Sequence, residues 1–86
     1  MKKIVTVIKP FVVDQHIFVY ENGNKIDLIT CKLEEIPTKM LELCSKYSSN
    51  RIELVGPKNY NRGIKKQIKE LEITKYNKEE IEIILL

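Results

Sequence analysis

The sequence predicts an α/β domain built on a five-stranded mixed sheet, with the element order β-β-β-α-β-α-β. Strand-like runs on both sides of Asn22-Gly23 indicate a hairpin near the start. Further along, two segments change to helical periodicity and enclose one short apolar run. A hairpin joins antiparallel strands and a β-α-β unit joins parallel ones, so the sheet must be mixed. The length of 86 residues fits a single domain, residues 1–86.

The first three strands come from the first 32 residues. Residues 2–9 are β-branched and almost continuously apolar, which predicts a strand buried on both faces and ended by Pro10. Residues 16–22 and 25–32 form the arms of the hairpin, because Asn and Gly accept the positive φ angles that a two-residue turn requires.

The remaining elements alternate between helix and strand. Residues 37–48 and 59–73 are expected to be helices, since their apolar residues recur at three- and four-residue steps. The residues on these helical faces are Met40, Leu41, Cys44 and Tyr47 in the first helix, and Ile64, Ile68 and Leu71 in the second. Residues 51–55 predict a short strand, and the alternation in 79–86 predicts a last one.

Composition excludes several classes of protein. A net charge of +3, from 15 basic and 12 acidic residues, is too small to indicate nucleic-acid binding without a local concentration of charge. Cys31 and Cys44 have no zinc or redox spacing and are expected to be small buried hydrophobes, and we expect no cofactor. The apolar run after Met1 breaks at Lys9-Pro10 without a cleavage site, so we expect a cytoplasmic protein with no membrane segment.

The element order resembles a short version of the ribonuclease H-like fold. The step from Ile52-Glu53-Leu54-Val55-Gly56 to Tyr60 and Gly63-Ile64 is similar to a strand-to-helix step of that superfamily. The resemblance implies a metal site of clustered carboxylates, the first of them from the middle of the first strand. That strand, Lys2 to Lys9, contains no acid, and only Asp27 and Glu53 are strand acids that could approach such a site. We therefore expect no catalytic residues and no metal ligands; a metal-dependent nuclease that uses Asp27 and Glu53 is the alternative.

The segment from Gly56 to Lys66 is the most informative candidate for a binding site. It places four cations and a tyrosine in a loop that enters a helix: Lys58, Tyr60, Arg62, Lys65 and Lys66. Helix N-termini attract anions, and basic residues in a first turn are poorly matched to the helix dipole, which favours an external anionic partner. The ordinary alternative is a solvated helix face, with Asn59 or Asn61 as the N-cap and Tyr60 at the edge of the core.

These observations together predict a small binding domain that contacts a protein or a nucleic acid through residues 58–66. Small accessory and antagonist proteins of phages and mobile elements are similarly small, of mixed charge and without catalytic residues, and by analogy this chain could be one of them. A homo-oligomeric structural domain is a further alternative, because the hairpin around Phe18 to Asn24 could pair with another chain edge to edge and form a homodimer.

Overall fold

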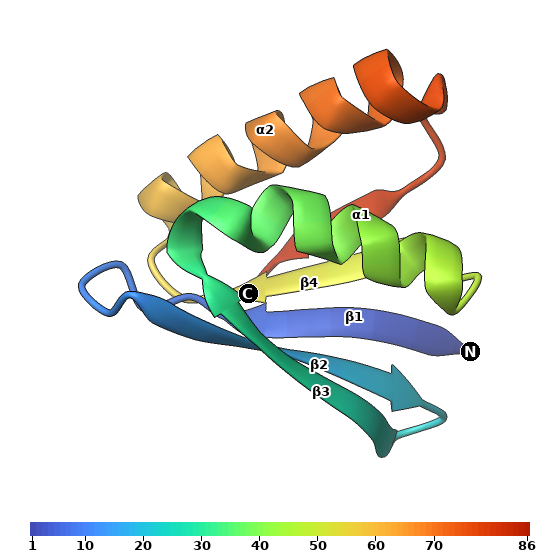
Figure 1. Ribbon diagram of the computed structural model, residues 1–86, viewed down its shortest axis with the longest axis horizontal. Coiled ribbons are helices and arrows are strands. Elements are labelled where there is room, and N and C mark those ends of the chain that lie inside the picture. Colours follow the sequence, from blue (N-terminus) through green and yellow to red (C-terminus); the bar gives the residue numbers. More distant parts are fainter.

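The chain forms a mixed five-stranded sheet with two helices, and the computed structural model describes all 86 residues (Figure 1). The elements are, in order, β1 (Lys2–Val7), β2 (Asp14–Glu21), β3 (Asn24–Lys32), the 3-10 helix η1 (Leu33–Glu35), α1 (Ile36–Lys46), β4 (Arg51–Val55), α2 (Lys58–Tyr76) and β5 (Glu82–Leu85). The strands lie in the order β3-β2-β1-β4-β5. Strand β2 is antiparallel to both β1 and β3, whereas β4 is parallel to both β1 and β5. The predicted fold class and element order are confirmed.

The hairpin turns where the sequence predicts it. Asn22 and Gly23 have φ angles of 52° and 85°, the left-handed values that suit a tight two-residue turn. The pairing of β2 and β3 shifts register beyond Val19, which pairs with Asp27 while Tyr20 pairs with Lys25. Ile26 is therefore the extra residue of a bulge near the start of β3.

Several boundaries differ from the prediction because side chains bind the backbone there. The first strand ends at Val7 rather than at residue 9, since the N–H and C=O of Lys9 bond to the Gln15 amide instead of to a strand. The last strand begins at Glu82 rather than at residue 79, since Glu72 holds the N–H groups of Glu80 and Ile81.

The ends of α2 also differ from the prediction. The helix runs three residues past 73, to Tyr76, and stops where Asn77 takes a left-handed φ of 51°. At its start the N-cap is Pro57, which has no side chain that could bond to the helix. The expectation that Asn59 or Asn61 would be the N-cap is therefore wrong: Asn61 lies inside the first turns, and its side chain is fully buried.

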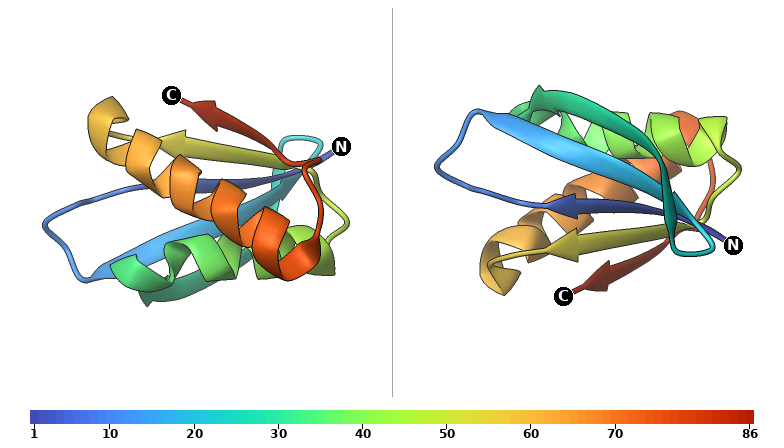
Figure 2. Two further views of the ribbon diagram at one scale, coloured as in Figure 1. Left: turned by 90° about the horizontal axis from the view of Figure 1, so that it is seen from above. Right: turned by 90° about the horizontal axis from the view of Figure 1, so that it is seen from below.

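Both helices cover the same face of the sheet (Figure 2). Helix α1 packs over β1, β2 and β3, α2 packs over β4 and β5, and the two helices contact each other. The core lies between these layers, and its strand residues are Ile4, Ile8, Ile17, Val19, Cys31, Ile52, Leu54 and Ile83. The helices add Ile36, Met40, Leu41, Leu43, Cys44, Ile64 and Ile68, so both cysteines are buried as expected.

The other face of the sheet carries no helix. The prediction that residues 2–9 form a strand buried on both faces is therefore wrong for the isolated chain. Ile4 and Thr6 are fully buried under the helices, but Val7, on the opposite side of β1, is 45% exposed. Periodicity shows that a strand is apolar on both sides, but it cannot show whether this chain supplies a cover for each. Neither helix is long and apolar enough to cross a lipid bilayer.

Candidate functional site

The uncovered side of the sheet is an ordered grid of side chains, which we call the open face. Alternate residues of a strand point to opposite faces, so the strand register places the residues of the open face in rows that cross the sheet. The first row contains Lys25, Tyr20, Lys3, Arg51 and Glu82, in the order β3 to β5. The second contains Leu28, Phe18, Val5, Glu53 and Ile84. The third contains Thr30, His16, Val7 and Val55, and Leu86 continues it beyond β5.

The second and third rows are mainly apolar. Seven of their side chains are hydrophobic, namely Val5, Val7, Phe18, Leu28, Val55, Ile84 and Leu86. Val7 and Leu28 are 45% and 46% exposed, and Leu86 is 54% exposed. Scattered surface hydrophobes are ordinary, but a continuous apolar patch on a sheet is typical of a surface that contacts something else.

The first row gathers the charges of the open face at one end. Glu53 is 7% exposed because two cations cover it: Lys3 Nζ lies 3.3 Å and Arg51 Nε 3.1 Å from its carboxylate. Arg51 also reaches Glu82 at 2.8 Å, so charges of alternating sign cross the sheet. Lys25 has no carboxylate within 4 Å and lies 5.4 Å from the centre of the Phe18 ring. The open face thus has an apolar region, the second and third rows, and a charged edge, the first row. Many protein interfaces have this arrangement.

An apolar loop extends from the sheet at the end of β1 (Figure 2). Phe11 is fully exposed, and Val12 and Val13 beside it are exposed as well. Gln15 fixes this loop from below: its Oε1 accepts the Lys9 N–H at 2.9 Å, and its Nε2 donates to the C=O of Lys9 at 2.8 Å and of Val12 at 2.6 Å. Because Gln15 is itself buried, the loop is held in one shape, and a preorganised apolar loop loses little entropy when it binds. This loop was not predicted as a contact, although three consecutive apolar residues after Pro10 are a signal visible in the sequence.

The cations of residues 58–66 share one side of α2. Successive helix residues are about 100° apart, so Lys58, Arg62, Lys65 and Lys66 lie within roughly one third of its circumference. None of the four has a carboxylate within 4 Å. Tyr60 lies on another side of the helix, where it lines a shallow hollow with Leu33 and Glu34. The structure brings the four cations together and places Tyr60 apart from them.

Asp27 and Glu53 lie on opposite faces of the sheet. Asp27 pairs with the buried Val19 and so lies on the helix side, whereas Glu53 belongs to the open face. The Asp27 carboxylate accepts hydrogen bonds from the Tyr47 hydroxyl and the Leu28 N–H, and these bonds lower the pKa of Asp27. The sheet itself separates the two acids that the nuclease alternative requires. No three His, Cys, Asp or Glu side chains come together as they would around a metal ion.

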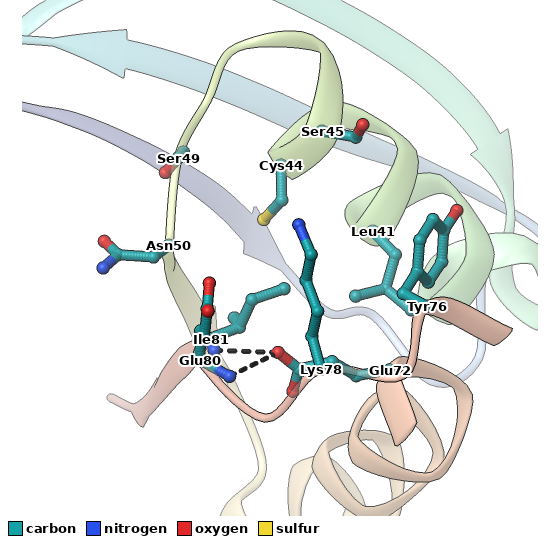
Figure 3. A pocket seen from close by; sticks show the side chains of 10 residues that line it. All are labelled: Leu41, Cys44, Ser45, Ser49, Asn50, Glu72, Tyr76, Lys78, Glu80 and Ile81. Atoms are coloured by element: carbon teal, nitrogen blue, oxygen red, sulfur yellow. Dashed lines mark hydrogen bonds between the residues drawn. The ribbon is translucent and has the colours of Figure 1, made fainter. Parts of the chain in front are cut away.

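A small cavity lies at the far end of the molecule, between the C-terminal ends of the helices and the start of β5 (Figure 3). It encloses about 100 Å³, below the roughly 300 Å³ of common ligand pockets. Glu72 forms part of its wall, with Oε2 accepting the N–H groups of Glu80 and Ile81, both at 2.9 Å. Burial raises the pKa of the neighbouring Cys44 thiol to about 12, so this sulfur stays protonated and is a poor nucleophile.

No protein-family model and no curated protein matches the sequence. Among solved structures, the chain is similar to a crystal structure from Bacteroides thetaiotaomicron VPI-5482, a protein with an actin-like ATPase fold and unknown function. The TM-score is 0.70. The match covers 99% of this chain at 12% identity. The ribonuclease H-like topology is therefore confirmed, since the actin-like fold shares it. The chain spans about a third of the larger protein, 32% of its length, and the likeness concerns the fold alone.

Proposed function

We propose that this chain is a binding domain that acts by surface contact, and that a protein partner covers its open face. The observation that carries the proposal is that the apolar side chains of the second and third rows lie on the side of the sheet that no helix covers. Strand β1 carries apolar residues on both sides, Val5 and Val7 on the open face and Ile4 on the other, as in strands that are covered on both faces. The helices of this chain cover only one side of β1, and a partner would cover the other side. A small accessory or antagonist protein would work in this way, by contact rather than by chemistry.

The anatomy of the open face supports a protein as the partner. Its apolar rows would form the dry centre of an interface, and the ion pairs of Lys3, Arg51, Glu53 and Glu82 would form part of its polar border. These charges are largely neutralised within the chain, so the face does not require a strongly charged partner. The fixed loop of Phe11 to Val13 lies at the end of β1 and adds an aromatic anchor of the kind that dominates many interfaces.

Site-specific photo-crosslinking tests the proposal. A photoreactive residue at Leu28 lies on the open face, and one at Ile73 provides a matched control, because the two positions are apolar and 46% and 47% exposed. We expect a discrete adduct from Leu28 in cells that express the protein, and none from Ile73. The mass of the adduct distinguishes a second copy of the chain from a different protein. Equal yields from both positions, or no adduct from Leu28, would refute the proposal.

The cations on α2 are a second candidate contact, for an anionic partner such as a nucleic acid. What favours it is that Lys58, Arg62, Lys65 and Lys66 share one side of the helix and have no carboxylate partners. The double variant Lys65→Glu and Lys66→Glu should weaken binding to single-stranded or duplex nucleic acid, and the dependence of binding on salt should fall. Unchanged, salt-independent binding would remove the electrostatic model. The single variants Lys65→Glu and Lys75→Glu change the net charge equally, so Lys75→Glu, near the other end of α2, is the matched control for Lys65→Glu.

A further inference from the structure

We infer that the β5 edge of the sheet binds an extended acidic segment of another protein, which adds to the sheet as a further strand. The β5 edge is the row of outward backbone groups of Ile83 and Leu85, at the margin of the sheet (Figure 2). It is separate from the open face, so the inference does not depend on what covers that face. It rests on the second candidate contact in one respect, because it names a peptide as the anionic partner of the cations on α2.

The hydrogen bonds of β5 show which of its backbone groups are free. The N–H groups of Glu82 and Leu86 donate to carbonyl groups of β4 and of the residue before it, at 2.8 and 2.9 Å. Because successive strand residues alternate, Ile83 and Leu85 direct their N–H and C=O groups away from β4. No hydrogen bond within the chain uses these four groups. A row of free groups at a sheet edge is a template for another strand.

The opposite edge of the sheet, along β3, is blocked by acids. Its outward residues are Leu28, Thr30 and Lys32. Asp27 Oδ1 accepts the N–H of Leu28 at 2.8 Å. Glu35 Oε1 accepts the N–H of Lys32 at 2.9 Å, and the bulge near the start of β3 distorts this edge further. Proteins protect sheet edges in this way, and only the β5 edge lacks the protection.

Cations of α2 lie beside the β5 edge. Gln67 lines a hollow with residues of α1, and Arg62 and Lys65 lie on roughly the opposite side of the helix, away from α1. The ammonium of Lys69, on that same side, donates to the C=O of Ile81, directly before β5. Since α2 and β5 run in opposite directions, Lys65 and Arg62, one and two turns nearer the start of α2, lie toward the end of β5. Neither has a carboxylate within 4 Å.

These two features together specify the chemistry of the partner. Free N–H and C=O groups in alternation are matched by a peptide backbone and not by the phosphates of a nucleic acid. In antiparallel pairing, the more stable kind per residue, the residues opposite Ile83 and Leu85 exchange both hydrogen bonds with them. Their side chains lie on the helix side of the sheet, where acids would meet Arg62 and Lys65. The residue between them lies beside Ile84 on the open face, so the expected segment alternates acidic with apolar residues.

A second copy of this chain suits the β5 edge less well. Paired with its own copy, β5 would place apolar side chains, Ile83 and Leu85, at the positions that the cations favour for acids. It would also bring the cations of two α2 helices toward each other, and like charges repel. The cations that attract an acidic segment therefore disfavour a homodimer at this edge.

Amide exchange measured by NMR, with a synthetic peptide in which Glu and Val alternate, tests the inference. In the free protein the N–H groups of Ile83 and Leu85 should exchange faster than that of Ile84, which faces β4. The peptide should slow exchange at Ile83 and Leu85. It should leave Thr30, on the β3 edge, unchanged.

Two methylated peptides separate backbone pairing from attraction by charge. N-methylation at every Glu removes the N–H groups that would face β5, and this peptide should not bind. N-methylation at every Val removes the N–H groups that face away from β5, and this peptide should bind almost as well as the parent. The two peptides have the same side chains and the same charge, so they are matched controls for each other.

A pair of protein variants tests the role of the cations. Lys65→Glu should weaken peptide binding about fivefold at low salt, the upper range for an exposed ion pair. Lys75→Glu changes the net charge equally, near the other end of α2, and should have little effect. Far-ultraviolet circular dichroism confirms that both variants fold.

The outcomes separate this inference from the proposed function. Unchanged exchange at Ile83 and Leu85 with the peptide, or equal binding of the two methylated peptides, overturns strand addition. Slower exchange at these amides with rising protein concentration alone would replace the peptide by a second copy. If a nucleic acid binds through Lys65 and the peptide does not, the electrostatic contact stands without strand addition. None of these results changes the crosslinking expected from Leu28 on the open face.

Discussion

Glu72 joins α2 to β5, and its replacement should have the largest effect of any single polar change in this chain. Its carboxylate is 1% exposed and accepts two backbone N–H groups, those of Glu80 and Ile81, on the same oxygen. Lys69 Nζ lies 3.3 Å from the other oxygen. These contacts fold the segment after α2 back toward the sheet, where the N–H of Glu82 bonds to the C=O of Asn50.

The expected cost follows from the number and type of these bonds. A hydrogen bond to a charged group contributes about 1.5–3 kcal/mol, and removing one partner of a buried charged contact costs about 3–5 kcal/mol. Glu72→Ala should therefore destabilise the protein by about 3–5 kcal/mol, a large part of the roughly 4–13 kcal/mol expected for a domain of this size. Glu72→Gln keeps an oxygen for both N–H groups but loses the charge, and should cost about 2 kcal/mol because neutral bonds are about half as strong.

Urea unfolding followed by circular dichroism measures both losses. With a slope of about 1 kcal/mol per molar urea, Glu72→Gln should lower the midpoint by about 2 M. Glu70→Ala removes an exposed carboxylate two residues away on the same helix and should change stability by less than about 0.5 kcal/mol. The reasoning fails if Glu72→Ala stays within 1 kcal/mol of the wild type, or if the two Glu72 variants are equally stable. Amide exchange should also show that β5 opens first in Glu72→Gln.

Three further perturbations have definite expected outcomes. Gln15→Ala should cost about 1–3 kcal/mol and speed amide exchange at Val12, because it removes the buried amide that fixes the apolar loop. Tyr47→Phe should raise the pKa of Asp27 toward its ordinary value, because the Tyr47 hydrogen bond is the main cause of its lowering; a carboxyl titration by NMR measures this. The stability that this bond adds should be present above the unfolded pKa of about 3.9 and disappear as the pH falls through the lower folded pKa. Cys44, with a pKa of about 12, should react with a thiol reagent at pH 8 only when the protein unfolds. Burial also raises the pKa of Cys31, so this thiol should react slowly. Rapid labelling of both thiols in the folded protein would contradict this expectation.

Local patterns were enough to predict most of the sheet. The turn at Asn22-Gly23 depends only on which residues accept positive φ, and it forms where expected. The alternation that puts Ile83 and Leu85 on one face of β5 and Ile84 on the other is also present. Such features are set by neighbouring residues, so they can be predicted without knowledge of the rest of the fold.

The hydrogen bonds that end the strands and connect one element to the next could not be predicted from neighbouring residues in the sequence. Gln15 and Glu72 resemble surface residues in the sequence, yet both are buried and bind backbone groups left free by the ends of strands and loops. Nothing in their immediate neighbours indicates this, because their partners are brought to them by packing. For the same reason the sequence left open whether Asp27 and Glu53 meet, and only the register of five strands places them on opposite faces.

The sequence by itself therefore determined the class of the fold, the order of its elements and the two-sided apolar character of β1. Only the tertiary structure decided that both helices lie on one side, so that the second apolar side of β1 faces outward as the centre of the open face. The physical reason is that periodicity reports which residues avoid water, whereas what covers them depends on where the connections carry each helix. In this chain both connections lead to the same face, and the other face carries no helix.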